Sequence, residues 1–263
     1  MGSDIKAVAQ NSVPTLVKYA NANPYPGNIE TQVQDLLRHE SVEVSDWCQL
    51  VDHAPEVQTL MLAAILYRYR NVAYTQSLQA VQLMTDTQRA ELVREVFAGH
   101  NRYTPPIREI EHGSFTFDIL LDQGAWYEVK RHRMLTLTTQ AFTPAFGYTV
   151  PALIDHGGMR AEYEALMQDC AELHPLLEGV SPGIGSYILP NAFKRRFLIT
   201  TNLRSAIHFI NLRAAPNAHY SVRRLAARMA EQLKHILPEF APYLFCDDPG
   251  DWREIEDRHF SVS

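Results

Sequence analysis

The chain has few cysteines, no long apolar run and no excess of positive charge, and each shortage excludes a class of protein. Its three cysteines, Cys48, Cys170 and Cys246, are far apart and form no C-x-x-C pair, so the sequence predicts neither a disulfide framework nor a zinc or other metal site. No apolar stretch approaches the roughly 18 residues that a transmembrane helix needs. The first residues lack the apolar core of a secretory signal. We therefore expect a cytoplasmic protein that does not cross a membrane.

The balance of charge is acidic, which argues against general nucleic-acid binding. The 24 lysines and arginines are outnumbered by 30 acidic residues, giving a formal net charge of −6 at pH 7, whereas a nucleic-acid-binding surface needs a basic footprint. With 263 residues, 46% of them hydrophobic, the chain is long enough for a sizeable core and has an ordinary globular composition. The composition therefore predicts a globular protein that is not a general nucleic-acid binder.

Hydrophobic periodicity and the positions of proline and glycine predict one α+β domain. Residues 1–28, rich in proline, are expected to form an irregular arm, residues 29–245 the domain, and residues 246–263 a polar tail. Extended segments are expected over residues 115–121, 186–189 and 193–201. Helices are expected over residues 29–39, 45–51, from 55 onward, 85–98, from 126 into the basic run that follows, 159–177, 202–212 and 221–237.

The most distinctive stretch is Arg131-His132-Arg133, which follows the aromatic pair Trp126-Tyr127. An arginine presents a rigid fork of donors that matches the oxygen pairs of a phosphate, and a histidine donates without a permanent charge. The run therefore indicates an anion-binding site. The alternative is a solvated basic turn, because short basic runs are common on protein surfaces.

Three blocks of residues together resemble the flavin-dependent thymidylate synthase family in a divergent form. The first is Arg131-His132-Arg133, the second is Glu111-His112 leading into an aromatic-rich strand, and the third runs from Asn202-Leu203-Arg204-Ser205 to Asn211-Leu212-Arg213. Their order and distances agree with that family over roughly residues 100–240. The resemblance implies an antiparallel sheet flanked by helices.

The resemblance also implies FAD as the cofactor and assigns residues to it. Arg213 falls on the arginine that orients and activates the pyrimidine ring of dUMP, and it is the expected catalytic residue. The implied reaction is the reductive methylation of a pyrimidine nucleotide, with NADPH as reductant and methylenetetrahydrofolate as carbon donor, in a homotetramer that builds each site from several subunits. The expected contacts to FAD are Arg131, His132, Arg133, Thr139, Asn202, Arg204 and His208. For His208, a structural role on its helix is the alternative.

Several positions depart from the family pattern, mainly on the side that binds dUMP. Thr138-Thr139 stands in place of an Asn-Glu pair, Ala141 in place of a serine, and Thr143-Pro144 in place of an Arg-Tyr pair. Glu128 replaces a glutamine, and a carboxylate beside a nucleotide phosphate would repel it. Ser186 replaces another phosphate-binding arginine. Since each lost charged hydrogen bond costs on the order of 1–3 kcal/mol, the pattern allows a related flavin-dependent reaction on a different substrate.

Two other functions compete with a flavoenzyme. The lost serine, glutamate and arginine positions are compatible with a non-catalytic homologue that binds FAD or a nucleotide and acts as a partner subunit or sensor. A metal-dependent hydrolase would use His100, Glu111 and His112. These three lack the i, i+4 spacing of a helical metal motif and have no further ligand pair nearby, so the sequence disfavours that function.

Overall fold

The computed structural model describes residues 2–20, 25, 29, 32–33, 46–101, 104–244 and 249–261. The chain divides into two compact units, Met1–Ser45 and Asp46–Ser263. The first unit contains α1 (Gly2–Ser12) and α2 (Pro14–Val17), so these residues of the expected irregular arm are helical. Proline is accommodated because Pro14 takes the first turn of α2, where its missing N–H is not needed. The helix expected over residues 29–39 lies mostly outside the described residues.

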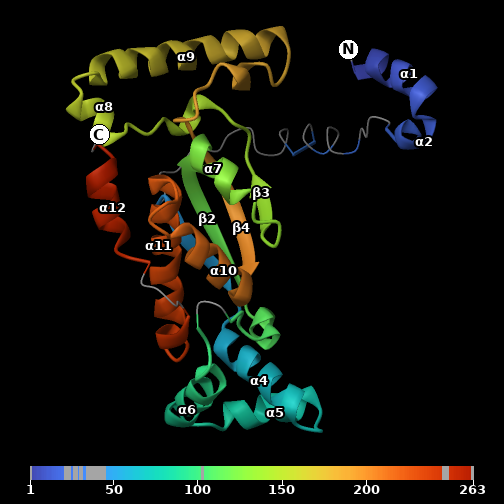
Figure 1. Cartoon of the computed structure of the whole chain (residues 1–263), viewed down its shortest axis with the longest axis vertical. Coiled ribbons are helices and arrows are strands. Elements are labelled where there is room, and N and C mark those ends of the chain that lie inside the picture. Colours follow the sequence, from blue (N-terminus) through green and yellow to red (C-terminus); the bar gives the residue numbers. More distant parts are fainter. Residues whose placement is uncertain are drawn as a thin grey trace. The chain divides into compact units, whose positions relative to one another are not determined.

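The second unit is built on an antiparallel sheet of four strands, as expected for the α+β class. The strands are β1 (Cys48–His53), β2 (Ser114–Asp122), β3 (Thr136–Thr139) and β4 (Lys194–Asn202). They lie in the order β1-β2-β4-β3, and every neighbouring pair is antiparallel. Because β2 and β4 run side by side over their full length in the centre, their ends hold the elements that follow them in fixed positions (Figure 1).

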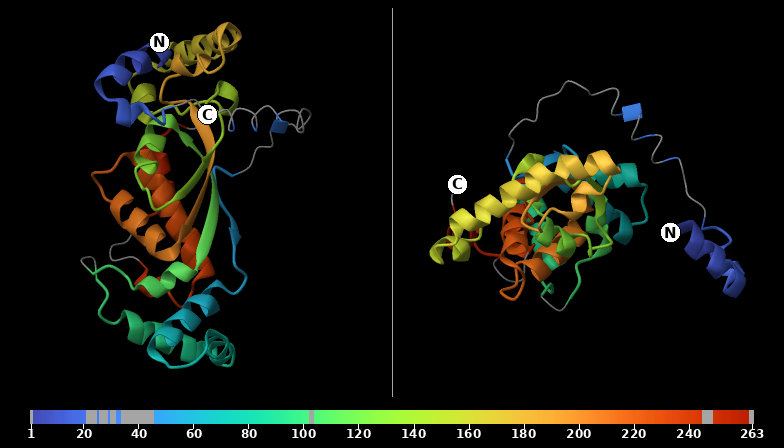
Figure 2. Two further views of the ribbon diagram at one scale, coloured as in Figure 1. Left: turned by 90° about the vertical axis from the view of Figure 1, so that its right-hand side faces the viewer. Right: turned by 90° about the horizontal axis from the view of Figure 1, so that it is seen from above.

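Helices cover one face of the sheet and both of its ends (Figures 1 and 2). The helices α10 (Leu203–Arg213) and α11 (Tyr220–Ile236) pack on the face, and α12 (Trp252–His259) packs on α11. One end carries α4 (Val57–Tyr69), α5 (Tyr74–Gln82) and α6 (Asp86–Phe97), and the other carries α8 (Ala152–His156) and α9 (Arg160–Val180). The remaining elements are α7 (Gln123–Val129), η1 (Arg108–His112), η2 (Pro144–Phe146), η3 (Gly185–Tyr187) and η4 (Ala241–Tyr243). None of the helices in the described ranges is long and apolar enough to cross a membrane.

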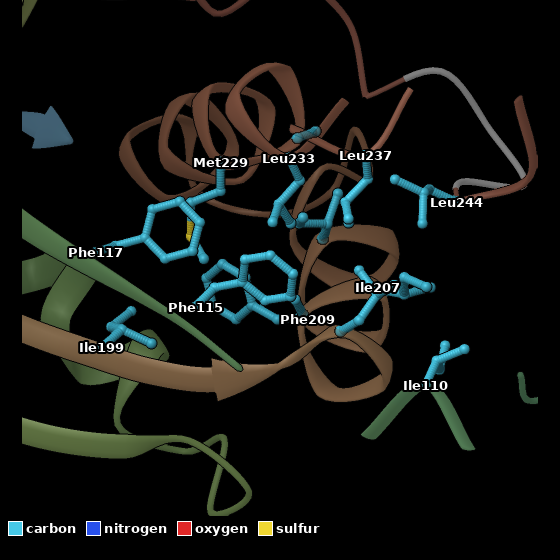
Figure 3. Close-up of a cluster of buried hydrophobic side chains, with 14 of the residues drawn as sticks. Ile110, Phe115, Phe117, Ile199, Ile207, Phe209, Met229, Leu233, Leu237 and Leu244 are labelled. Carbon is cyan, nitrogen blue, oxygen red and sulfur yellow. The ribbon is translucent and has the colours of Figure 1, made fainter. Parts of the chain in front are cut away.

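The main core lies between the sheet and the helices that cover it. Successive side chains of a strand point to opposite faces, and along β2 the residues Phe115, Phe117 and Ile119 are fully buried. Figure 3 shows these phenylalanines beside Phe209 of α10 and Met229 of α11. On the opposite face polar pairs cross the strands, such as the Thr116 and Thr200 hydroxyls at 2.9 Å. One face of the sheet is therefore apolar and the other is mixed.

The expected strands at 115–121 and 193–201 are confirmed, as are the helices α4, α6, α9, α10 and α11. Three expectations were wrong. Residues 48–53 form β1 instead of a helix because they pair with β2, residues 185–187 form η3 instead of a strand, and α7 ends at Val129, before the basic run. The expected C-terminal tail also differs, since α12 lies within it and Trp252 packs against Trp47, with ring centroids 5.6 Å apart.

Gly113, which joins η1 to β2, is packed too closely for a side chain. A Cβ atom there would lie 2.8 Å from Met61 Sδ and 2.9 Å from Val57 Cγ2, both on α4. We expect Gly113→Ala to lower the free energy of unfolding by about 1–3 kcal/mol, the usual cost of overpacking, as measured by urea denaturation. Gly99→Ala is the control, since nothing lies within 4 Å of a Cβ at that position. Equal losses in the two variants would contradict the packing argument.

Candidate ligand-binding site

A cleft of about 610 Å³ opens between three segments of the second unit. They are the loop after α6, the loop between α7 and β3, and one face of α10. Two of these segments are tied to the central strands: α10 begins where β4 ends, and the loop before β3 leaves α7, which begins where β2 ends. Among the described residues that line the cleft, arginine, histidine and asparagine are present and no acidic residue is. The cleft therefore suits a ligand with negative charge and several hydrogen-bonding groups.

The basic run forms the loop that leaves α7. The start of the helix is capped by Asp122, whose Oδ1 accepts a hydrogen bond from the Ala125 N–H at 2.8 Å. After its end, the His132 N–H donates to the Val129 carbonyl at 3.0 Å. The exposed side chains of Arg131 and Arg133 line the cleft and make no hydrogen bond or ion pair with residues that the structure describes. Their two guanidinium forks are therefore available to an anionic group of a ligand.

The first turn of α10 is set by Asn202, whose Oδ1 accepts a hydrogen bond from the Ser205 N–H at 2.9 Å. This is the usual role of asparagine at the start of a helix. The helix buries Ala206, Phe209 and Ile210 in the core. Its other side is turned to the cleft, so residues three or four positions apart share that wall: Arg204, His208 and Asn211, with Ser205 and Arg213 beside them.

Arg204 is held in place by the chain before β2. Its Nε donates to the Pro106 carbonyl at 2.9 Å, and its Nη1 donates to Glu111 Oε1 at 3.1 Å. The side-chain hydrogen bonds from Arg108, with Arg204 also nearby, lower the pKa of Glu111. The Glu111 carboxylate thus accepts hydrogen bonds from two arginines, Arg108 and Arg204. In the described ranges no cluster of three histidine, cysteine or acidic side chains is arranged to hold a metal ion.

Arg213, at the end of α10, reaches across to the end of α7. Its Nη1 forms an ion pair with the Glu128 carboxylate, and its Nη2 donates to the Glu128 backbone carbonyl at 3.1 Å. Its Nε donates to His132 Nε2 at 2.8 Å. Glu128 was expected to repel a bound phosphate, and its contact with Arg213 was not predicted. No local spacing links the two residues, which are 85 positions apart.

His132 lies at the centre of this arrangement. Its ring meets the Phe209 ring edge to face, with centroids 4.8 Å apart, and the His208 ring lies at 6.0 Å. Burial, with smaller contributions from the positive charge of Arg213 and from His208, lowers the pKa of His132 to about 4. The imidazole is therefore neutral at physiological pH, and it can donate or accept a hydrogen bond without adding charge to the cleft.

Six of the eight residues proposed from the sequence come together in this cleft. They are Arg131, His132, Arg133, Arg204, His208 and Arg213. Asn202 does not line the cleft, and its side chain caps α10 instead. Thr139 lies on β3, where it pairs with Phe197 and is exposed outside the cleft. Asn211 and Ser205 line the cleft and were not proposed; for Asn211, the helical spacing from Arg204 and His208 was a usable signal.

The chain matches a known protein family. The family model described as thymidylate synthase complementing protein matches residues 49–239. The flavin-dependent thymidylate synthase of Geobacter sulfurreducens is 27% identical over 199 residues, which cover 72% of this chain and 82% of that enzyme. That of Nitratidesulfovibrio vulgaris is 24% identical over 210 residues, covering 73% of this chain and 83% of the enzyme.

Longer relatives are also similar to the chain. A UPF0159 protein of Thermoplasma acidophilum is 28% identical over 196 residues, which cover 73% of this chain but 39% of the relative. The corresponding protein of Chlamydia muridarum is 28% identical over 198 residues, covering 74% of this chain and 37% of the relative. The chain therefore spans about two-fifths of the length of these relatives. The region that the family model matches includes β2, β3, β4 and the described lining of the cleft.

Proposed function

Because the chain belongs to the thymidylate synthase complementing protein family, we propose that it is a flavoenzyme that binds FAD in this cleft. The proposed reaction is the reductive methylation of a dUMP-type pyrimidine nucleotide, or a related flavin-dependent reaction on a different substrate. The observation that carries the proposal is the convergence of Arg131, Arg133, Arg204 and Arg213 on one cleft whose described lining is free of carboxylates. A bound flavin supplies the hydride chemistry, with NADPH as the proposed reductant and methylenetetrahydrofolate as the proposed carbon donor.

The residues of the cleft fit a flavin dinucleotide. A pyrophosphate needs paired cationic donors, and the guanidinium groups of Arg131 and Arg133 are free to provide them. An isoalloxazine ring needs hydrogen-bond donors near the atoms where negative charge grows on reduction. His132, His208 and Asn211 line the same cleft and can supply such donors. In this proposal the chain binds and orients the cofactor, and no side chain acts as a nucleophile.

Arg213 is the proposed catalytic residue, since a guanidinium at that point can stabilise negative charge that develops on a bound pyrimidine. Its contacts with Glu128 and His132 hold it at the edge of the cleft. We extend the proposal to a homotetramer, because the family resemblance implies sites shared between subunits and part of the cleft is exposed in the single chain.

Visible absorption of the purified protein tests the proposal. With FAD added, we expect the flavin bands to shift and sharpen as the ring leaves water, and the protein to retain the flavin through gel filtration. Anaerobic NADPH should then bleach these bands, and a substrate that oxidises the reduced flavin should restore them. Failure of FAD to bind at micromolar protein concentration would contradict the proposal. Binding of FAD without bleaching by NADPH would support the flavin-binding site and contradict the proposed reduction by NADPH.

A non-catalytic homologue that binds FAD or a nucleotide is the second candidate. The ion pair between Glu128 and Arg213 favours it, because a guanidinium already neutralised by the chain has less charge to offer a substrate. This protein would act as a partner subunit or sensor. The two candidates differ in the anaerobic experiment, since the sensor would bind FAD and remain oxidised in the presence of NADPH.

A further inference from the structure

The contact between Arg213 and His132 restricts where the histidine can carry its proton. A guanidinium has donors and no acceptor, and it stays protonated in proteins. Arg213 Nε donates to His132 Nε2 at 2.8 Å, so Nε2 must offer a lone pair. In a neutral imidazole the proton then lies on the other ring nitrogen, Nδ1.

Glu128 determines which guanidinium nitrogen faces His132. Its carboxylate holds Nη1, and its own backbone carbonyl holds Nη2 at 3.1 Å. These two contacts fix the plane of the guanidinium and leave Nε directed at the imidazole. The side chains of Arg213 and Glu128 are only 15% and 25% exposed, so the pair is stronger than an ion pair on an open surface. Glu128 therefore acts on His132 through Arg213.

The other charges around His132 agree with a neutral ring. Arg213 and His208 face it from α10, and Arg131 and Arg133 flank it in its own loop. His100 lines the same cleft from the loop after α6. Glu128 is the acidic group in this set, and it is paired with Arg213. Protonation of the imidazole would place a further positive charge among these arginines, and it would set an N–H of the ring against the N–H of Arg213.

We propose that Glu128 is a positioning residue that, through Arg213, holds His132 as a neutral imidazole with its proton on Nδ1. The inference rests on the proposed function for its ligand, since His132 lines the proposed flavin cleft. Nδ1 makes no hydrogen bond within the part of the chain that the structure describes, so its N–H is left for the ligand. At this point the cleft thus offers an uncharged N–H donor to an acceptor of the ligand, such as a ring carbonyl oxygen or a ring nitrogen without a proton.

Nuclear magnetic resonance of the full-length protein with nitrogen-15 histidine tests the proposal without any ligand. Long-range proton–nitrogen correlation spectra distinguish the two neutral tautomers, and His132→Gln identifies the signal of His132. In the wild type we expect the Nδ1–H form at neutral pH and a titration midpoint near pH 4. In Glu128→Ala, Arg213 is no longer held against the ring, so the ring should populate both tautomers, while its pKa should stay below the ordinary value of about 6.5 because burial, the largest cause of the shift, remains.

Glu128→Gln is the matched variant, because its amide oxygen still accepts from Nη1 while the charge is gone. It should keep the Nδ1–H form, and its titration midpoint should be no higher than that of the wild type. Glu128→Asp, which retains the charge and shortens the reach, takes the place of Glu128→Ala if that variant does not fold. An Nε2–H ring in the wild type, or a Glu128→Ala spectrum identical to it, would overturn the proposal. If the wild-type protein shows the Nδ1–H form but does not bind FAD, the proposed function is contradicted and the assignment of the His132 tautomer is not.

Discussion

Replacing Arg131 and Arg133 together with glutamine is expected to weaken FAD binding by about 10²- to 10⁴-fold. Each arginine can form a charge-assisted hydrogen bond worth about 1.5–3 kcal/mol, and a tenfold change in affinity corresponds to about 1.4 kcal/mol. Both side chains are exposed in the loop after α7 and make no hydrogen bond or ion pair within the described ranges. The fold should therefore be unaffected. Isothermal titration calorimetry with FAD, at a fixed salt concentration, measures the effect.

Lys130→Gln is the control for this double variant. Lys130 is the neighbouring cation, but it lies over the Tyr127 ring at 4.4 Å and does not line the cleft. We expect it to change FAD affinity by less than about threefold, since an exposed charge outside the site acts only through screened long-range electrostatics. A similar loss in Lys130→Gln would mean that the general charge of the loop matters and the two guanidinium forks do not. An unchanged affinity for FAD in the double variant would show that Arg131 and Arg133 do not contribute to FAD binding.

Phe117→Ala is expected to lower the free energy of unfolding by about 3–5 kcal/mol, the range for removing a buried phenylalanine side chain. Phe117 is fully buried at the centre of β2, opposite Ile199 of β4 and beneath Met229 of α11 (Figure 3). The truncation leaves a cavity between the sheet and α11 that close-packed neighbours cannot fill. Guanidinium denaturation followed by circular dichroism, at one protein concentration, measures the loss.

Leu198→Ala provides the matched control on the other face of the same sheet. Leu198 is the neighbour of Ile199 along β4, but its side chain points to the opposite face and is 38% exposed. Burial of a half-exposed leucine side chain contributes little to stability, so we expect the free energy of unfolding to fall by about 1 kcal/mol or less. If Leu198→Ala were as destabilising as Phe117→Ala, the face of the sheet opposite α10 and α11 would have to be covered in solution. That result would point to packing between chains.

The two faces of the sheet explain how the cleft is supported. Phe115 and Phe117 fix β2 against α10 and α11, and the elements that end in the cleft leave from the central strands. Arg213 then connects α10 to α7 through Glu128 and His132. A change in the core of the sheet should therefore reach the cleft, while a change at Arg131 or Arg133 should remain local.

The sequence by itself determined the elements whose signals are local. The alternation along residues 115–121 predicted β2, and the helical stripes after Pro55 and Asn202 predicted α4 and α10. The motif Arg131-His132-Arg133 and the later Asn-x-Arg-Ser block identified the family and six residues of the cleft. These signals are readable because hydrophobic period, capping residues and motif spacing depend on neighbours along the chain.

Only the tertiary structure decided the features that depend on distant partners. Residues 48–53 form a strand because they pair with the edge of β2. The helix α12 lies in the expected tail because Trp252 packs against Trp47 and Arg228. Likewise Asn202 became a helix cap and Thr139 an exposed strand residue outside the cleft. Glu128 meets Arg213 across 85 positions. Such contacts leave no period or spacing in the sequence, because they form only when the sheet has brought the ends of β2 and β4 together.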